Sequence, residues 1–91
     1  MAELEKIFSA LDFAARQHIF QRRKGTFNIP YINHPIRVCH LLIQCGEIDP
    51  DLLMAALLHD VVEDTPVTAE DIARQFGETV ARIVEEVTDN M

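Results

Sequence analysis

The apolar positions of this chain recur with helical spacing, in stretches separated by short polar turns. At the amino-terminal end they repeat every three or four residues, which predicts an amphipathic helix from about Glu3 to Phe20. A second helix is expected from Asn33, a polar cap that shortly precedes Pro35, to the helix-ending Gly46. The face of this second helix expected to be buried consists of Ile36, Cys39, Leu42 and Ile43.

The central apolar stretch, from Leu52 to Leu58, has no polar face. A helix of this kind is typically buried on all sides. Asp49-Pro50 predicts its start and Thr65-Pro66 its end. The apolar stretch leads directly into four residues that bind metals or carry protons, which are His59, Asp60, Glu63 and Asp64.

Two shorter helices are expected after the central one. Thr68 to Asp71 caps a fourth helix that ends near Gly77, and a fifth helix runs from about Glu78 to Val87. No strand-like alternation is present, so the sequence predicts a compact all-α bundle of about five helices forming one domain over residues 1–91. The fifth helix carries a stripe of branched apolar side chains, which are Val80, Ile83, Val84 and Val87. Because an exposed stripe is costly, we expect a homo-oligomer in which a second copy covers it.

Composition and charge limit the possible partners. The chain has 91 residues, is 48% hydrophobic and carries a formal net charge of −7. An acidic chain disfavours nucleic acid, which is bound through basic patches. No apolar stretch reaches the roughly 18 residues of a membrane span, and no signal peptide is evident, so we expect no membrane partner and a cytoplasmic location. The two cysteines, Cys39 and Cys45, are expected to be reduced thiols in the core.

The segment from Gln21 to Asn33 lacks a clear period and is predicted to be a loop by Gly25 and Pro30. It holds three of the eight basic residues, including Arg23 and Lys24. Such a cluster on an acidic chain suits a phosphorylated ligand, because guanidinium groups pair with phosphate. A solvated helix end with cations near its carboxyl terminus explains the same residues equally well.

The imidazole and carboxylates that follow the central apolar stretch indicate a metal site. At about 100° per residue they point into one sector of the helix, and burying them is costly unless a cation compensates their charge. His34, at the rigid start of the second helix, supplies a second imidazole. His34, His59 and Asp60 form a mixed nitrogen and oxygen set that suits Mn²⁺, Fe²⁺ or Zn²⁺. Glu63 and Asp64 are then placed to handle a proton or to orient water. The alternative is a helix that emerges into solvent with surface carboxylates. His18 is interpreted as a core or rim residue, and His40 as a packing or surface residue.

Several ordered motifs resemble one known family. They are Arg23-Lys24, Tyr31-Ile32-Asn33-His34-Pro35, the segment from Ala55 to Thr65, Phe76-Gly77, and the segment from Val84 to Asp89. The sequence resembles the HD hydrolase domain of the RelA/SpoT group, above all its small stand-alone members of the metazoan SpoT homologue type. The resemblance implies an all-α fold, Mn²⁺ as the ion, and removal of the 3′-pyrophosphate of ppGpp and pppGpp. It also implies roles for particular residues: His34, His59 and Asp60 as ligands, Glu63 and Asp64 as catalytic groups, and Arg23 and Lys24 as nucleotide contacts.

The chain departs from this family in one respect. Family members take a further aspartate ligand from a Lys-Ala-Asp-like motif on a later helix, and these 91 residues contain no such motif. We therefore expect the sequence to correspond to the N-terminal half of such a domain, with its catalytic competence open. Two other classes of function remain. One is an HD phosphohydrolase acting on a nucleotide monophosphate or cyclic nucleotide, and the other is a non-catalytic metal-binding or interaction module.

Overall fold

The computed structural model describes residues 2–22 and 29–89, without the side chains of residues 88 and 89. Within these ranges the only β-type pairing is an isolated bridge between Arg22 and Pro30. The predicted all-α fold class is therefore confirmed. The helices are α1 (Ala2–Gln17), α2 (Asn33–Gln44), α3 (Pro50–Asp64), α4 (Ala69–Phe76) and α5 (Glu78–Asp89).

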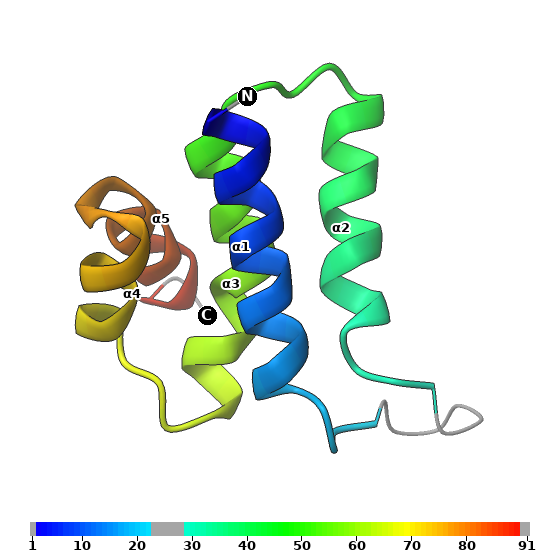
Figure 1. Ribbon diagram of the computed structural model, residues 1–91, viewed down its shortest axis with the longest axis vertical. Helices are drawn as coiled ribbons and strands as arrows, with labels where there is room; N and C mark the ends of the chain where they lie inside the picture. The colour runs from blue at the N-terminus through cyan, green and yellow to red at the C-terminus, as the bar shows by residue number, and fades with distance from the viewer. Residues whose placement is uncertain (1, 23–28, 90–91) are drawn as a thin grey trace.

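Helix α3 is the centre of the fold. It packs against α1, α2 and α5, and Figure 1 shows α2 on one side of it and the α4–α5 pair on the other. The side chain of Asp49 accepts a hydrogen bond of 3.0 Å from the backbone N–H of Asp51, which fixes the start of the helix. At the other end, the Thr65 hydroxyl donates to the carbonyl of Val61 at 2.7 Å. The prediction of a buried central helix is confirmed by its fully buried side chains, among them Met54, Leu57, Leu58 and Val61.

The α4–α5 pair closes the other side of the core. Thr68 and Asp71 form a reciprocal capping box at the start of α4, and Gly77 adopts φ 106° where the chain turns into α5. Helix α5 packs on both α3 and α4, which buries Val80 and Val84 completely. The expected exposed stripe is therefore half covered within one chain, and Val87 is its most open member at 43% exposure.

Helix α1 ends three residues earlier than the periodicity predicts. Its last helical residue is Gln17, and the chain then turns, with the backbone N–H of Gln21 donating to the carbonyl of His18 at 2.8 Å. His18 is nevertheless only 1% exposed, so it extends the buried stripe of α1 after the helix itself has ended. A periodic apolar pattern reports which side chains are buried. Here the buried stripe continues beyond the last helical residue.

Helix α2 begins differently from the prediction. Asn33 is its first residue and not its cap, and no side-chain hydrogen bond caps the helix. Backbone carbonyls of the preceding turn replace the cap, because Pro30 accepts from the N–H of Asn33 at 3.1 Å and Tyr31 accepts from the N–H of His34 at 3.0 Å.

The expected buried face of α2 is only partly buried. Cys39 is buried, but Ile36 and Ile43 are 42% and 50% exposed. The reason is that α2 packs mainly on α3, so its side toward α1 borders an apolar groove of about 240 Å³. Cys45 is exposed, so the expectation of two core thiols is wrong for that residue.

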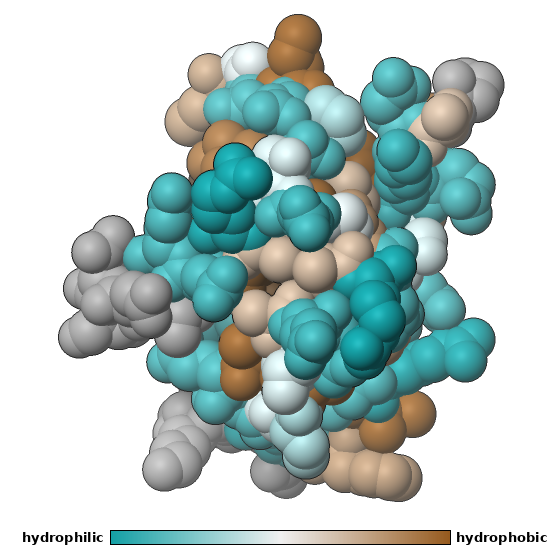
Figure 2. Space-filling view, turned by 90° about the vertical axis from the view of Figure 1, so that its left-hand side faces the viewer, coloured by the Kyte–Doolittle hydropathy of each residue, from teal (hydrophilic) through white to brown (hydrophobic). Residues whose placement is uncertain are grey.

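Two features concern the surface. The side of the molecule covered by α4 and α5 is mostly hydrophilic, with smaller hydrophobic areas between the polar side chains (Figure 2). In the part of the chain that the structure describes, no helix combines the length and the apolar character needed to cross a membrane.

Candidate metal centre

The last turns of α3 carry two pairs of polar residues, each pair four residues apart. A spacing of four places both members of a pair on the same face of a helix. In the first pair, Nε2 of His59 lies 3.2 Å from Oε2 of Glu63. The second pair consists of Asp60 and Asp64. The helix therefore presents one imidazole–carboxylate row and, beside it, one row of two carboxylates.

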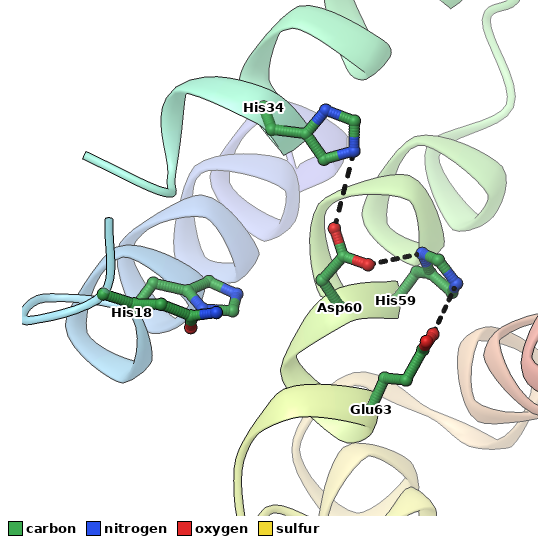
Figure 3. Close-up of polar contacts among 6 residues, drawn as sticks. His18, His34, His59, Asp60 and Glu63 are labelled. Carbon is green, nitrogen blue, oxygen red and sulfur yellow. Dashed lines mark hydrogen bonds and ion pairs between the residues drawn. The ribbon is translucent and has the colours of Figure 1, made fainter. Parts of the chain in front are cut away.

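Asp60 connects these rows to α2. Its Oδ1 lies 3.1 Å from Nδ1 of His59, and its Oδ2 lies 3.7 Å from Nε2 of His34. Figure 3 shows His34 pointing from α2 toward Asp60, so that the carboxylate lies between two imidazoles. The carboxylate is largely shielded from water, since Asp60 is 9% exposed. The three residues predicted as metal ligands thus lie together, while their role as ligands stays a prediction.

The geometry fits a divalent ion. Ligand atoms from His59, Asp60 and Glu63 all lie within 4.8 Å of one another, which one ion can bridge. Nε2 of His59 is buried, and its approach to Glu63 lacks the alignment of a hydrogen bond, so this nitrogen is free to bind a cation. Nitrogen and carboxylate oxygen together are the donor set of Mn²⁺, Fe²⁺ and Zn²⁺ sites.

This group of neighbouring ligand atoms differs in one residue from the predicted set of metal ligands. Glu63, predicted as a catalytic residue, belongs to the tightest group of ligand atoms, whereas His34 approaches that group only through Asp60. Asp64 is exposed at the end of α3. Glu63 therefore has the geometry to bind an ion directly as well as to handle a proton.

Tyr31 and His18 also belong to this region, although the sequence reasoning assigned neither to the site. The ring of Tyr31 lies 4.8 Å from that of His18 and 6.0 Å from that of His34, measured between ring centroids. Burial raises the pKa of the Tyr31 hydroxyl, and the charge and hydrogen bonding of Asp60, with a smaller contribution from Asp64, raise it further. No periodicity signals this contact, because Tyr31 precedes α2 and His18 follows α1.

Both basic residues predicted to bind the nucleotide, Arg23 and Lys24, lie outside the described residues. Their neighbour Arg22 is exposed, and its guanidinium donates to the carbonyls of Ile19 and Gln21 at 3.1 and 3.2 Å. These contacts hold the Arg22 side chain against the turn that follows α1.

A cavity of about 200 Å³ adjoins the polar cluster on the side of α2 and α5. His34, His59 and Asp60 form its polar end. Its remaining lining is apolar and includes Val38, Leu42, Leu52, Ile83 and Val87. The partly exposed end of the α5 stripe therefore borders the same cavity as the candidate metal ligands.

The described residues form an all-α domain with a His-Asp pair on its central helix and a further histidine facing that pair from α2. These features define a class of metal-binding hydrolytic domains. Residues 10–91 match the family model described as HD domain, and the chain belongs to this family. The resemblance noted in the sequence is thereby confirmed. Within the described residues, the matched region contains no strand.

Individual relatives are similar over almost the whole chain. Guanosine-3′,5′-bis(diphosphate) 3′-pyrophosphohydrolase MESH1 of Homo sapiens is 50% identical over 90 residues, which cover 98% of this chain and 50% of that protein. The Aquifex aeolicus guanosine-3′,5′-bis(diphosphate) 3′-pyrophosphohydrolase is 46% identical over 92% of this chain and 12% of its own length. A solved structure of a metazoan orthologue of SpoT that hydrolyses ppGpp superimposes with a TM-score of 0.86 at 46% identity, over 90% of this chain and 47% of the other. The chain spans about half the length of its metazoan relatives.

Proposed function

We propose that this chain contributes to metal-dependent hydrolysis of guanosine 3′,5′-bis(diphosphate) and its pentaphosphate analogue, with removal of the 3′-pyrophosphate. The observation that carries the proposal is the gathering of His59, Asp60 and Glu63 ligand atoms within 4.8 Å on a buried helix. The names of the human and Aquifex relatives support the choice of substrate. Because the chain spans about half of the metazoan relatives, their activity is a proposal for this chain.

In this proposal His34, His59 and Asp60 hold the ion, with Mn²⁺ as the first choice and Fe²⁺ or Zn²⁺ as alternatives. A bound divalent ion supplies Lewis-acid polarisation of the phosphoryl group and a lowered pKa of water. Glu63 and Asp64 take the proton of the attacking water. The water oxygen bonds to the phosphorus attached to the ribose 3′ oxygen, the bond from that phosphorus to the 3′ oxygen breaks, and the 3′ oxygen takes up a proton.

Arg23 and Lys24 bind the nucleotide in this proposal. Their support is chemical: they are cationic residues in a chain with a net charge of −7, and guanidinium groups pair well with phosphate. A small-molecule substrate and a cytoplasmic location complete the proposal.

The test is a hydrolysis assay on protein loaded with Mn²⁺, in which release of pyrophosphate from ppGpp is measured. Glu63→Gln should lower the rate on the order of 100-fold, since it removes a group that accepts the proton of water. Glu86→Gln is the matched control, because Glu86 is an exposed residue of α5 and lies away from the cluster. Equal rates for the two variants would contradict the role of Glu63.

The same assay separates the alternatives. Turnover of a nucleotide monophosphate or a cyclic nucleotide, without turnover of ppGpp, would favour a different HD phosphohydrolase. Binding of Mn²⁺ without turnover of any of these substrates would favour a metal-binding module. Hydrolysis of ppGpp by the wild-type chain is the result that the proposal requires.

We also propose that the chain forms a homo-oligomer. Support comes from apolar side chains that one copy leaves open, namely Val87 beside the cavity and the residues around the groove between α1 and α2, which include Leu4, Phe8, Ile36 and Ile43. A two-fold pairing buries the same patch on both copies. Sedimentation velocity at micromolar concentration should give the mass of a dimer, and a monomer at that concentration would refute the pairing.

A further inference from the structure

Helices α1 and α2 run side by side in opposite directions, and each packs on α3 more than on the other (Figure 1). A hollow of about 240 Å³ lies between their middle turns, and another of about 360 Å³ lies where α1 ends and α2 begins. The two hollows share their sides, because Leu11 and Ala15 are one turn apart on α1, and Ile32 and Ile36 are one turn apart at the start of α2. Together they form one apolar channel along both helices, which we call the α1–α2 groove.

The side of α1 beside this groove carries large apolar side chains in contact with water. Leu4 is 50% exposed, Phe8 is 62% exposed, and Ile19, just beyond the helix, is 59% exposed. Ala15 lies between the last two in the sequence and is partly exposed. Spacings of four and seven residues place such side chains in one row, which is the pattern of a helix that packs against another helix. Exposed apolar surface that is gathered in this way marks a site for a protein partner.

The charges of α1 indicate which partner fits. Its first turn carries Glu3 and Glu5, and its last turn carries Arg16. Arg16 meets Asp12 through Nε at 3.1 Å, so the two terminal amino groups of the guanidinium are not needed for that ion pair. A helix that is acidic at its start and basic at its end is complementary to a second copy of itself that runs in the opposite direction. Because a chain with a net charge of −7 repels a second copy over most of its surface, a face where opposite charges meet is favoured.

We propose that two copies of this chain pair through α1, antiparallel about a two-fold axis, so that α1 of each copy covers the α1–α2 groove of the other. In this register Phe8 packs on Ala15 of the second copy, so that a protruding ring meets a small side chain. Leu4 packs on Ile19 of the second copy. Each contact occurs twice, because a two-fold interface uses the same patch on both copies.

The same register brings Glu5 of each copy beside Arg16 of the other and forms two ion pairs across the axis. The inference rests on the proposed homo-oligomer and goes beyond it, because it assigns the interface to α1. It leaves the cavity beside the candidate metal ligands outside the interface.

That cavity is the competing surface, and it suits a second copy less well. In the described part of the chain, Val87 is the exposed large apolar residue of α5. Its neighbours Glu85 and Glu86 are exposed carboxylates. A two-fold pairing at this end of α5 brings the carboxylates of both copies together, and facing like charges oppose association.

The first test compares one variant at each surface by sedimentation over a range of concentrations. Phe8→Ser should raise the dissociation constant of the dimer by about 30-fold, the effect of losing an aromatic anchor of an interface. Val87→Ser is the matched control and should leave the dimer intact. Circular dichroism should show wild-type helical content in both variants, because Phe8 lies largely in water within one copy. Dissociation of Val87→Ser but not of Phe8→Ser would overturn the assignment to α1 and keep the homo-oligomer. A monomeric wild-type chain would overturn both.

The second test exchanges charges and does not depend on removing an apolar side chain. Glu5→Arg and Arg16→Glu should each weaken the dimer by about 10-fold, since each places two pairs of like charges across the axis. An equimolar mixture of the two variants should pair again, because every new arginine then faces a new glutamate. The double variant should likewise form dimers by itself. A mixture that sediments like its separate components, or single variants that pair as tightly as the wild type, would refute the antiparallel register.

Discussion

Helices α2 and α4 both lie at the edge of the core, yet they are built in opposite ways. Helix α4 has only 8 residues but carries a capping box, ends at a glycine with positive φ, and buries Ile72 completely. Helix α2 has 12 residues, has no side-chain cap, and leaves Ile36 about 42% exposed. The shorter helix is thus the better fixed of the two.

The difference matters because the candidate site depends on α2 and not on α4. His34 reaches Asp60 only if α2 is seated on α3, and no residue of α4 contributes to the cluster. Regions with few buried contacts open at low free-energy cost, and functional elements are drawn from them. The comparison indicates that α4 is fixed by its own cap, while the site joins the buried helix α3 to a helix without a side-chain cap.

The sharpest test of this comparison uses two isoleucines, each the fourth residue of its helix. Ile72→Ala in α4 should lower the free energy of unfolding by about 2–5 kcal/mol, because it leaves a cavity in the core. Ile36→Ala in α2 should cost ~1 kcal/mol, since much of that side chain is already in water. Helix propensity changes equally in both, so urea unfolding at neutral pH isolates the packing. Similar losses would show that α2 is as well packed as α4.

Much of the fold is predictable from the sequence because local signals and burial agree. The apolar segment from Leu52 to Leu58 predicts the central helix, and Asp49-Pro50, Thr65 and Gly77 predict helix boundaries that the structure confirms within about a residue. Prediction fails where the local helix signals and the burial of a side chain do not agree. His18 is buried beyond the end of α1, and Ile36 has the spacing of a core residue but faces the open groove between α1 and α2.

The candidate site likewise has one part that the sequence predicts and another part that it does not. Helical spacing alone brings His59, Asp60 and Glu63 together, so this part is predictable from one segment. The approach of His34 to Asp60 depends on how α2 docks on α3, which spacing does not encode. The place of Tyr31 beside His34 is not predictable from spacing, because its ring packs on His18, which lies beyond the end of α1.

A smaller effect is expected at the helix starts. Thr68→Ala should cost about 1 kcal/mol, because the Thr68 hydroxyl accepts from the backbone N–H of Asp71 at 3.2 Å. Asn33→Ala is the counterpart in α2, where backbone carbonyls replace a side-chain cap, and it should change stability by less than about 0.5 kcal/mol. Chemical unfolding of both variants gives the comparison. A cost for Asn33→Ala as large as that for Thr68→Ala would mean that α2 has a side-chain cap in solution.

The smallest expected effect is a pH dependence confined to α4. The backbone N–H of Thr68 donates to Oδ2 of Asp71 at 3.1 Å and lowers the pKa of that carboxyl, and the Thr68 hydroxyl and Arg74 lower it further. Because the folded pKa lies below the unfolded value of about 4, the contribution of Asp71 is complete above pH 4 and is lost as pH falls through the folded pKa. Asp71→Asn should therefore destabilise the protein at pH 7 more than at pH 3, whereas Asn33→Ala should show the same difference from wild type at both. Urea unfolding at the two pH values measures this, and an equal effect of Asp71→Asn at both would mean that the carboxylate charge does not contribute to the cap.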